Sequence, residues 1–158
     1  MTINGIIQFD SALVLDKRAR SWCRLPYASH KHGCPKFGKC ALCPPKVCLF
    51  KDFIDTTKPM WLYYIEFDLA AHMAAKKQKH PKWTERQCRN LLYWQPTVNK
   101  ELRMLVENAC PENLARTFCP EAMGVNVIKT ARNAGLNVSY RPRTLVYKIA
   151  IAGYPANS

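Results

Sequence analysis

Residues 34–48 read CPKFGKCALCPPKVC and hold four cysteines in fifteen residues, together with three prolines and one glycine. A segment so rich in proline is a poor helix or central strand, because proline lacks the backbone N–H that either structure needs. Closely spaced cysteines in such a loop usually arrange their sulfur atoms around a metal ion or cluster. The segment therefore predicts a metal-binding loop around which the rest of the chain folds.

Chain length and composition predict a single domain over residues 1–158. A chain of this length can bury a hydrophobic core of its own, and 48% of its residues are apolar. No apolar run approaches the roughly 18 residues of a membrane-spanning helix, so no membrane partner is expected. The N-terminal residues lack the basic start of a secretion signal, which predicts a cytoplasmic protein.

The chain has eight cysteines, and disulfides are rare in the reducing cytosol. Metal or redox chemistry is then their favoured use, with a buried apolar role as the alternative. We expect that alternative for Cys88, which falls on the apolar face of a helix predicted after the capping box of Thr84. His30 and His32 are either additional ligands or solvated imidazoles, and their spacing, which fits no zinc finger, favours the second.

The formal net charge is +13, from 24 lysines and arginines against 11 acidic residues. A positive field of this size attracts nucleotides, nucleic acids and other anions, although a solvated basic surface is the alternative. Arg141 and Arg143 are candidate phosphate contacts because guanidinium groups match phosphate oxygens, and Lys36 and Lys39 are candidates within the cysteine loop. The basic segment 70–82 is either an anion-binding patch or an exposed, solubilising helix.

Apolar periodicity predicts an α+β domain. Residues 60–70 are rich in aromatic and branched side chains and predict a central strand. Further strands or hairpins are expected at 3–15 and 137–153, and helices at 49–57, 84–95, 98–109 and 127–134. We expect a small, mostly antiparallel sheet with helices on one face and a cysteine-rich metal-binding lobe near its edge.

Proline follows cysteine at positions 34, 43, 110 and 119, as in ferredoxin cluster loops. Only one CxxC pair lies in the loop, whereas zinc ribbons use two such pairs or a later histidine pair. The pattern therefore favours an iron–sulfur cluster, and zinc is the alternative.

Two ordered motifs support this interpretation. GCPKFGKCALCPP (33–45) and, further on, LARTFCPEAMGVNVIKTARNAGL (114–136) together resemble the family of predicted metal-binding proteins with domain of unknown function 2284. The resemblance implies that Cys34 and Cys43 are ligands and that Cys23 takes the place of the family's earlier cysteine. It puts Cys110 and Cys119 in the downstream cysteine region. Relative to the family loop, Cys40 and Cys48 are additions.

Two ligand sets follow. A local site would use the loop cysteines alone: Cys34, Cys40, Cys43 and Cys48. A cross-fold site would join Cys23, Cys34 and Cys43 to Cys110 or Cys119 around one [4Fe-4S] cluster, and the resemblance favours this second set.

Two functions compete accordingly. The first is redox or sulfur chemistry on an anionic substrate, either a nucleotide or a nucleic acid. The second is a zinc-stabilised basic nucleic-acid-binding module, or an assembly subunit, without catalysis. No acid–base pair, nucleophile motif or phosphate-binding glycine loop is visible in the sequence, which leaves the class of reaction open.

Overall fold

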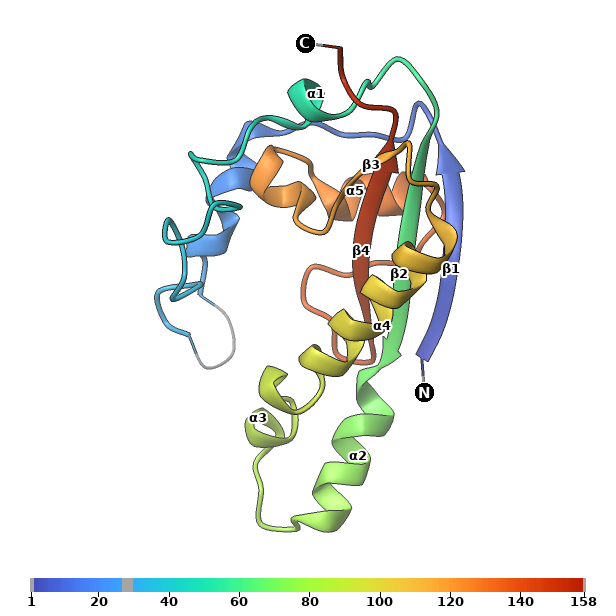
Figure 1. Ribbon diagram of the computed structural model, residues 1–158. Coiled ribbons are helices and arrows are strands. Elements are labelled where there is room, and N and C mark those ends of the chain that lie inside the picture. Colours follow the sequence, from blue (N-terminus) through green and yellow to red (C-terminus); the bar gives the residue numbers. More distant parts are fainter. Residues whose placement is uncertain (1, 27–29, 158) are drawn as a thin grey trace.

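The computed structural model describes residues 2–26 and 30–157. At its centre lies a four-stranded antiparallel sheet with the strand order β1-β2-β4-β3 (Figure 1). The strands are β1 (Thr2–Phe9), β2 (Met60–Asp68), β3 (Ala115–Thr117) and β4 (Leu145–Gly153). The predicted α+β class and small antiparallel sheet are confirmed.

Helices and 3₁₀ turns fill the connections between the strands. The helices are α1 (Phe50–Phe53), α2 (Leu69–Lys79), α3 (Glu85–Cys88), α4 (Gln95–Ala109) and α5 (Val127–Asn133). The 3₁₀ turns are η1 (Lys17–Arg24), η2 (Leu91–Tyr93) and η3 (Pro120–Met123). No helix of the described residues is long and apolar enough to cross a membrane.

Strand β2 is central, as predicted, and pairs along its whole length with β4 and from Met60 to Phe67 with β1. Successive side chains of a strand point to opposite faces of the sheet. Leu62 and Ile65 point to opposite faces and are both fully buried, so both faces of β2 are covered. This explains why its sequence, MWLYYIEFD, is nearly continuously apolar instead of alternating.

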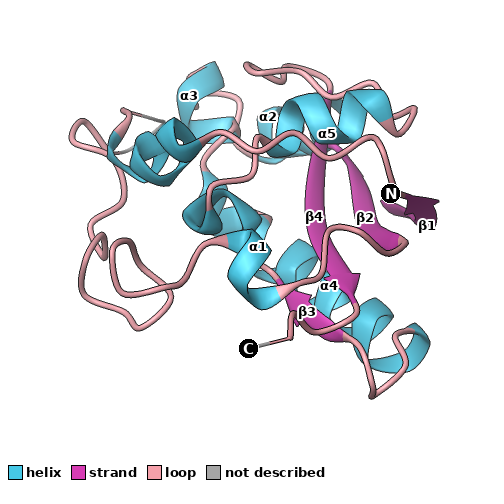
Figure 2. Cartoon of the chain, turned by 90° about the horizontal axis from the view of Figure 1, so that it is seen from above, coloured by secondary structure: helices cyan, strands magenta, loops and turns pink. Residues whose placement is uncertain are grey.

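Each face of the sheet has its own hydrophobic core. On one face, Val98, Leu102 and Val106 of α4 pack in a core with β2 residues such as Ile65. On the other face, α1 and α5 contribute to a core with Leu62. Figure 2 shows α4 and α5 on opposite sides of β2 and β4. The prediction of helices on one face is thus corrected, because a strand that is apolar on both faces needs cover on both.

Several predicted elements differ in their extent, and the helix predicted at 49–57 is limited to α1 (Phe50–Phe53). Residues 137–153 form one strand, β4, preceded by a loop that contains Pro142. Residues 3–15 form β1 alone, and Leu15 makes only an isolated bridge. The helix predicted at 84–95 is divided into α3 and η2, and Pro96 lies in the first turn of α4, where its missing N–H costs nothing.

Signals at helix ends predicted the structure well. Thr84 and Gln87 form the expected capping box at the start of α3. Asn126 caps α5 by accepting a hydrogen bond from the Lys129 N–H, at 3.0 Å. Gly135 follows that helix with φ of 103°, the left-handed conformation in which glycine is favoured.

The segment before η1 is joined to the segment after η3. Asp16 N–H donates to the Gly124 carbonyl at 2.7 Å, and Leu15 bridges to Val125. Val14 N–H donates to the hydroxyl of Thr130, a fully buried α5 residue, at 3.0 Å. These bonds hold the start of the cysteine-bearing region against the sheet.

Thr130→Val keeps the shape of the side chain but leaves Val14 N–H without its partner. We expect a loss of about 1–3 kcal/mol in the free energy of unfolding, the usual cost of an unsatisfied buried group. Urea unfolding measures this, and Thr97→Val, at an exposed position in α4, is the matched control. Equal effects of the two substitutions would show that the Thr130 hydrogen bond contributes nothing.

Candidate metal centre

Residues 17–26 and 30–48 form a lobe beside the sheet, drawn in blue and teal at the left of Figure 1. The lobe consists of η1 and the cysteine loop, which is a series of turns without helix or strand, as its prolines predict. Cys34 N–H donates to the Cys23 carbonyl at 2.6 Å, and Arg20 donates to the Val47 carbonyl at 2.6 Å. The loop is therefore tied to η1 near both of its ends.

Gly33 makes the first of these attachments possible. Its φ is 80°, and a Cβ at this position would overlap the backbone carbonyl of Cys23. Only glycine combines this left-handed backbone with so close an approach of two chain segments. The glycine before Cys34 is thus a structural requirement of the lobe.

Cys23 interacts electrostatically with three other predicted ligands, Cys34, Cys43 and Cys119. Cys23 ends η1, Cys34 and Cys43 lie in the loop, and Cys119 precedes η3, which packs against η1. Burial raises the pKa of the Cys23 thiol most, followed by the Glu121 carboxylate and then by Cys34, Cys43 and Cys119. These cysteines come from three separate segments, and we call them the cysteine group: Cys23, Cys34, Cys43 and Cys119.

The sulfur of Cys43 has a different environment from that of Cys23. A backbone N–H of Cys40 makes the largest contribution to lowering the pKa of Cys43, and backbone groups of Gly38 and Lys39 add to it, while burial opposes them. The Cys43 Sγ also lies 3.3 Å from the Lys36 carbonyl oxygen. N–H groups directed at a sulfur favour its thiolate form, the form that binds metal.

Charged residues that the sequence analysis did not single out lie around Cys119. Burial raises the pKa of Cys119 most and the Glu121 carboxylate raises it further, whereas Lys148 and Arg103 oppose this. Burial lowers the pKa of Lys148, which is attracted to Glu121 and Cys119. The sequence alone could have drawn attention to Lys148, because it is the one charged residue within the apolar strand LVYKIAIAG.

Of the remaining four cysteines, Cys40 interacts with Cys43 and so lies beside the group, whereas Cys88 and Cys110 are buried. Cys110 is buried in the core beneath α4, where burial and then a hydrogen bond with Cys110 raise the pKa of Tyr63 to about 12. Cys88 is buried, as predicted, and Cys40 and Cys48 are exposed on the loop. Of the two downstream candidates, the structure therefore brings Cys119 into the cysteine group.

The candidate anion contacts are all at the surface. Arg141 and Arg143 are exposed in the loop before β4, and Lys36 and Lys39 are exposed in the cysteine loop. His32 is exposed and His30 half-buried at the start of that loop. The structure leaves the predicted anion contacts in two separate loops.

No family model, curated protein or solved structure matches this chain. The resemblance to the family with domain of unknown function 2284 therefore stays a prediction. What the centre can bind has to be argued from its donor atoms.

The described residues offer no ready-made site for a single metal ion. Within residues 2–26 and 30–157, no three histidine, cysteine, aspartate or glutamate side chains are grouped to hold one metal ion. A tetrahedral zinc site needs sulfurs about 3.8 Å apart, given Zn–S bonds of about 2.3 Å. Thiolates around a four-iron cluster are spaced more widely, because each binds a different iron. Cysteine thiolates are the usual ligands of such clusters, and a cluster at these thiols stays a prediction.

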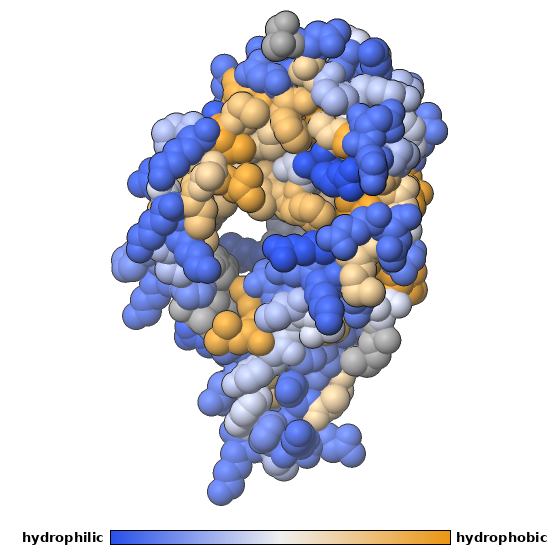
Figure 3. All heavy atoms as spheres, in the orientation of Figure 1, coloured by the Kyte–Doolittle hydropathy of each residue, from blue (hydrophilic) through white to orange (hydrophobic). Residues whose placement is uncertain are grey.

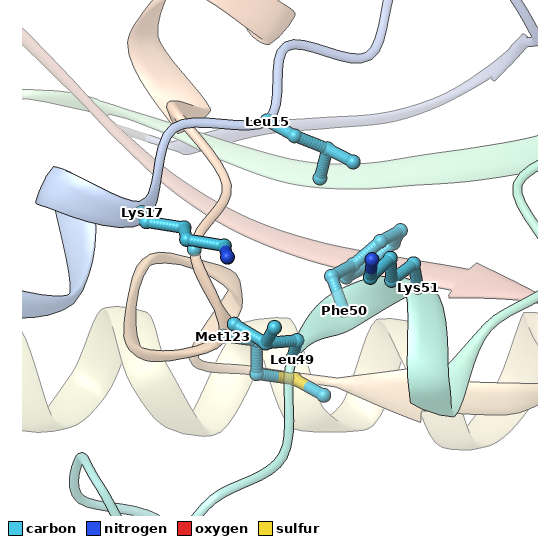
Figure 4. Close-up of a pocket in the computed structure, with 7 residues that line it drawn as sticks. Leu15, Lys17, Leu49, Phe50, Lys51 and Met123 are labelled. Atoms are coloured by element: carbon cyan, nitrogen blue, oxygen red, sulfur yellow. The ribbon is translucent and has the colours of Figure 1, made fainter.

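A small pocket lies next to the lobe. Its volume is about 110 Å³, and its lining is mostly apolar, with Phe50 and Met123 among its residues. Figure 4 shows the side chains of Lys17 and Lys51 at this pocket. Figure 3 shows that the molecular surface is also open between the lobe and the sheet. Small molecules therefore have routes toward this side of the protein.

Proposed function

We propose that this is a metal-binding protein that holds one [4Fe-4S] cluster through Cys23, Cys34, Cys43 and Cys119. The observation that carries the proposal is that Cys23 of η1 interacts electrostatically with Cys34 and Cys43 of the cysteine loop and with Cys119, which precedes η3, a turn that packs against η1. Thiols that repel one another when ionised are stabilised by a shared cation or cluster.

The surroundings of the cysteine group act in both directions: burial and Glu121 raise the pKa values of Cys23 and Cys119, and nearby cations lower that of Cys119. Lys148 and Arg103 oppose the rise in the pKa of Cys119 and so favour its thiolate. The backbone N–H groups directed at Cys43 likewise favour the thiolate form of that loop residue. Hydrogen bonds to cluster sulfurs and nearby charge are the means by which proteins set cluster potentials.

A bound cluster would supply one-electron transfer or sulfur chemistry. The substrate we propose is an anion, either a nucleotide or a nucleic acid, because the chain carries a net charge of +13. The ammonium groups of Lys17 and Lys51 at the pocket offer one place where an anion could approach the lobe. The chain's own part is to hold the thiolates, attract the anion and limit the access of water.

The alternative is a zinc ion bound within the loop. One observation favours it, because the Cys40 side chain also forms a hydrogen bond with Cys43. A local site of Cys34, Cys40, Cys43 and Cys48 would then stabilise the lobe. The protein would be a zinc-stabilised basic nucleic-acid-binding module or an assembly subunit, without redox chemistry.

Metal and sulfide analysis separates the two. Protein expressed in iron-supplemented cells and purified without oxygen is expected to be brown, with iron matched by acid-labile sulfide. Stoichiometric zinc without sulfide in the same preparation would overturn the iron–sulfur proposal and leave the zinc alternative.

A further inference from the structure

An arm extends beyond the end of the sheet, at the bottom of Figure 1. It consists of α2, α3 and η2, which lie between β2 and α4 in the chain, and α2 packs against α3. Asp68, the last residue of β2, caps α2 by accepting a hydrogen bond from Ala71 N–H at 2.9 Å. The arm is thus a direct and ordered continuation of the central strand.

The arm is strongly basic. Between residues 69 and 93 the chain has one acidic residue, Glu85, and six lysines and arginines: Lys76, Lys77, Lys79, Lys82, Arg86 and Arg89. Glu85 lies 3.7 Å from Arg89. Within the described part of the chain, the other five cations have no carboxylate at ion-pair distance. In Figure 3 the lower end of the molecule is accordingly mostly hydrophilic.

Aromatic rings are stacked among these cations. The rings of His80 and Trp83 are 4.0 Å apart and inclined by 12°, and those of Trp83 and Tyr93 are 5.3 Å apart and inclined by 25°. The Lys76 ammonium lies 4.8 Å from the centre of the Tyr93 ring, and Lys77 donates to the Trp83 carbonyl at 2.6 Å. We call His80, Trp83 and Tyr93 the aromatic stack.

The aromatic stack is not part of the hydrophobic core. The neighbouring residues Leu91 and Trp94 pack against the core beneath α4, whereas Tyr93 is 46% exposed and Leu92 is 75% exposed. Stability of the core therefore does not explain the stack. His80 and Trp83 are half-buried and Tyr93 is exposed, and in the described part of the chain the lysines beside them have no carboxylate partner. Such a set of rings and cations has the features of a ligand surface.

We infer that the arm binds single-stranded nucleic acid. Unpaired bases stack on aromatic side chains irrespective of sequence, while lysines and arginines neutralise the phosphates. A duplex would present its phosphates to the lysines but keep its base faces inside the helix, so it would leave the aromatic stack unused. The inference does not depend on the proposed metal centre, because no residue of the arm belongs to the cysteine group.

The test is binding of a fluorescently labelled single-stranded oligonucleotide of mixed sequence, followed by anisotropy at several salt concentrations. Trp83→Leu with Tyr93→Leu removes the stacking faces and should weaken binding roughly 5- to 100-fold, the effect of losing one stacked base. Lys79→Gln with Lys82→Gln should weaken binding and reduce the slope of log affinity against log salt by about 1.4. Both lysines are exposed, so this second variant is expected to fold normally.

Lys100→Gln with Lys129→Gln is the matched control, because it removes the same charge from exposed positions outside the arm. The inference holds if the two arm variants lose affinity and the control does not, in protein with its metal content unchanged. Equal losses in arm and control variants would overturn it. So would tighter binding to duplex, or arm-dependent binding to vesicles containing phosphatidylserine without binding to the oligonucleotide. Metal analysis of each variant keeps this result separate from the test of the cluster.

Discussion

Cys119→Ala is expected to remove most of the iron and acid-labile sulfide from anaerobically purified protein, together with its visible absorbance. Cys119 immediately precedes η3 and is the one member of the cysteine group that lies outside the lobe. A cluster that loses one of four thiolate ligands becomes labile and open to solvent. Cys23→Ala, which removes the thiol at the end of η1, should cause the same loss of iron and sulfide.

Two matched substitutions make this prediction specific. Cys48→Ala removes an exposed thiol from the same loop, and Cys110→Ala removes the other downstream candidate, which is buried beneath α4. Both variants are expected to keep their iron, although Cys110→Ala should unfold at a lower urea concentration because it leaves a small cavity. Loss of iron from Cys48→Ala, with iron retained in Cys119→Ala, would instead establish the local loop site.

Sequence reasoning succeeded where the signal is local. The apolar run of β2, the capping box at Thr84 and the residues Asn126 and Gly135 around α5 each depend on a few neighbouring residues. The three-residue strand β3 has no such signal, because it exists only through pairing with β4. The packing of helices on both faces of the sheet likewise depends on segments that are distant in the sequence.

In the candidate site, too, local sequence patterns say little about which distant residues come together. Cysteine spacing predicted a metal-binding loop, which stays a prediction, and it left Cys110 and Cys119 as equal alternatives nine residues apart. Their separation arises from the path of the chain, since Cys110 ends α4 on one face of the sheet while Cys119 follows β3 and meets η1. The aromatic stack escaped detection for a related reason, because the turn after α2 is what brings Trp83 and Tyr93 together.

Gly33→Ala should abolish metal binding although it removes no sulfur. Its Cβ would overlap the Cys23 carbonyl, which accepts the hydrogen bond from Cys34 N–H. The obstacle is backbone, so it cannot rotate away as a side chain can, and η1 and the cysteine loop must separate. Cys34 would then move away from Cys23, and we expect iron content below about a tenth of the wild-type value, since ligand geometry has to be held closely.

Gly38→Ala is the control that separates overlap from backbone strain. Gly38 lies in the same loop with nearly the same φ, 76° against 80°, but a Cβ there would meet no atom within 4 Å. Both substitutions carry the cost of a left-handed residue, roughly 1–2 kcal/mol, and only Gly33→Ala adds the overlap. Iron analysis and urea unfolding of both variants measure the difference. If Gly38→Ala lost as much iron as Gly33→Ala, loop strain alone would account for the result, and the contact between Cys34 and Cys23 would not be what holds the cysteine group together.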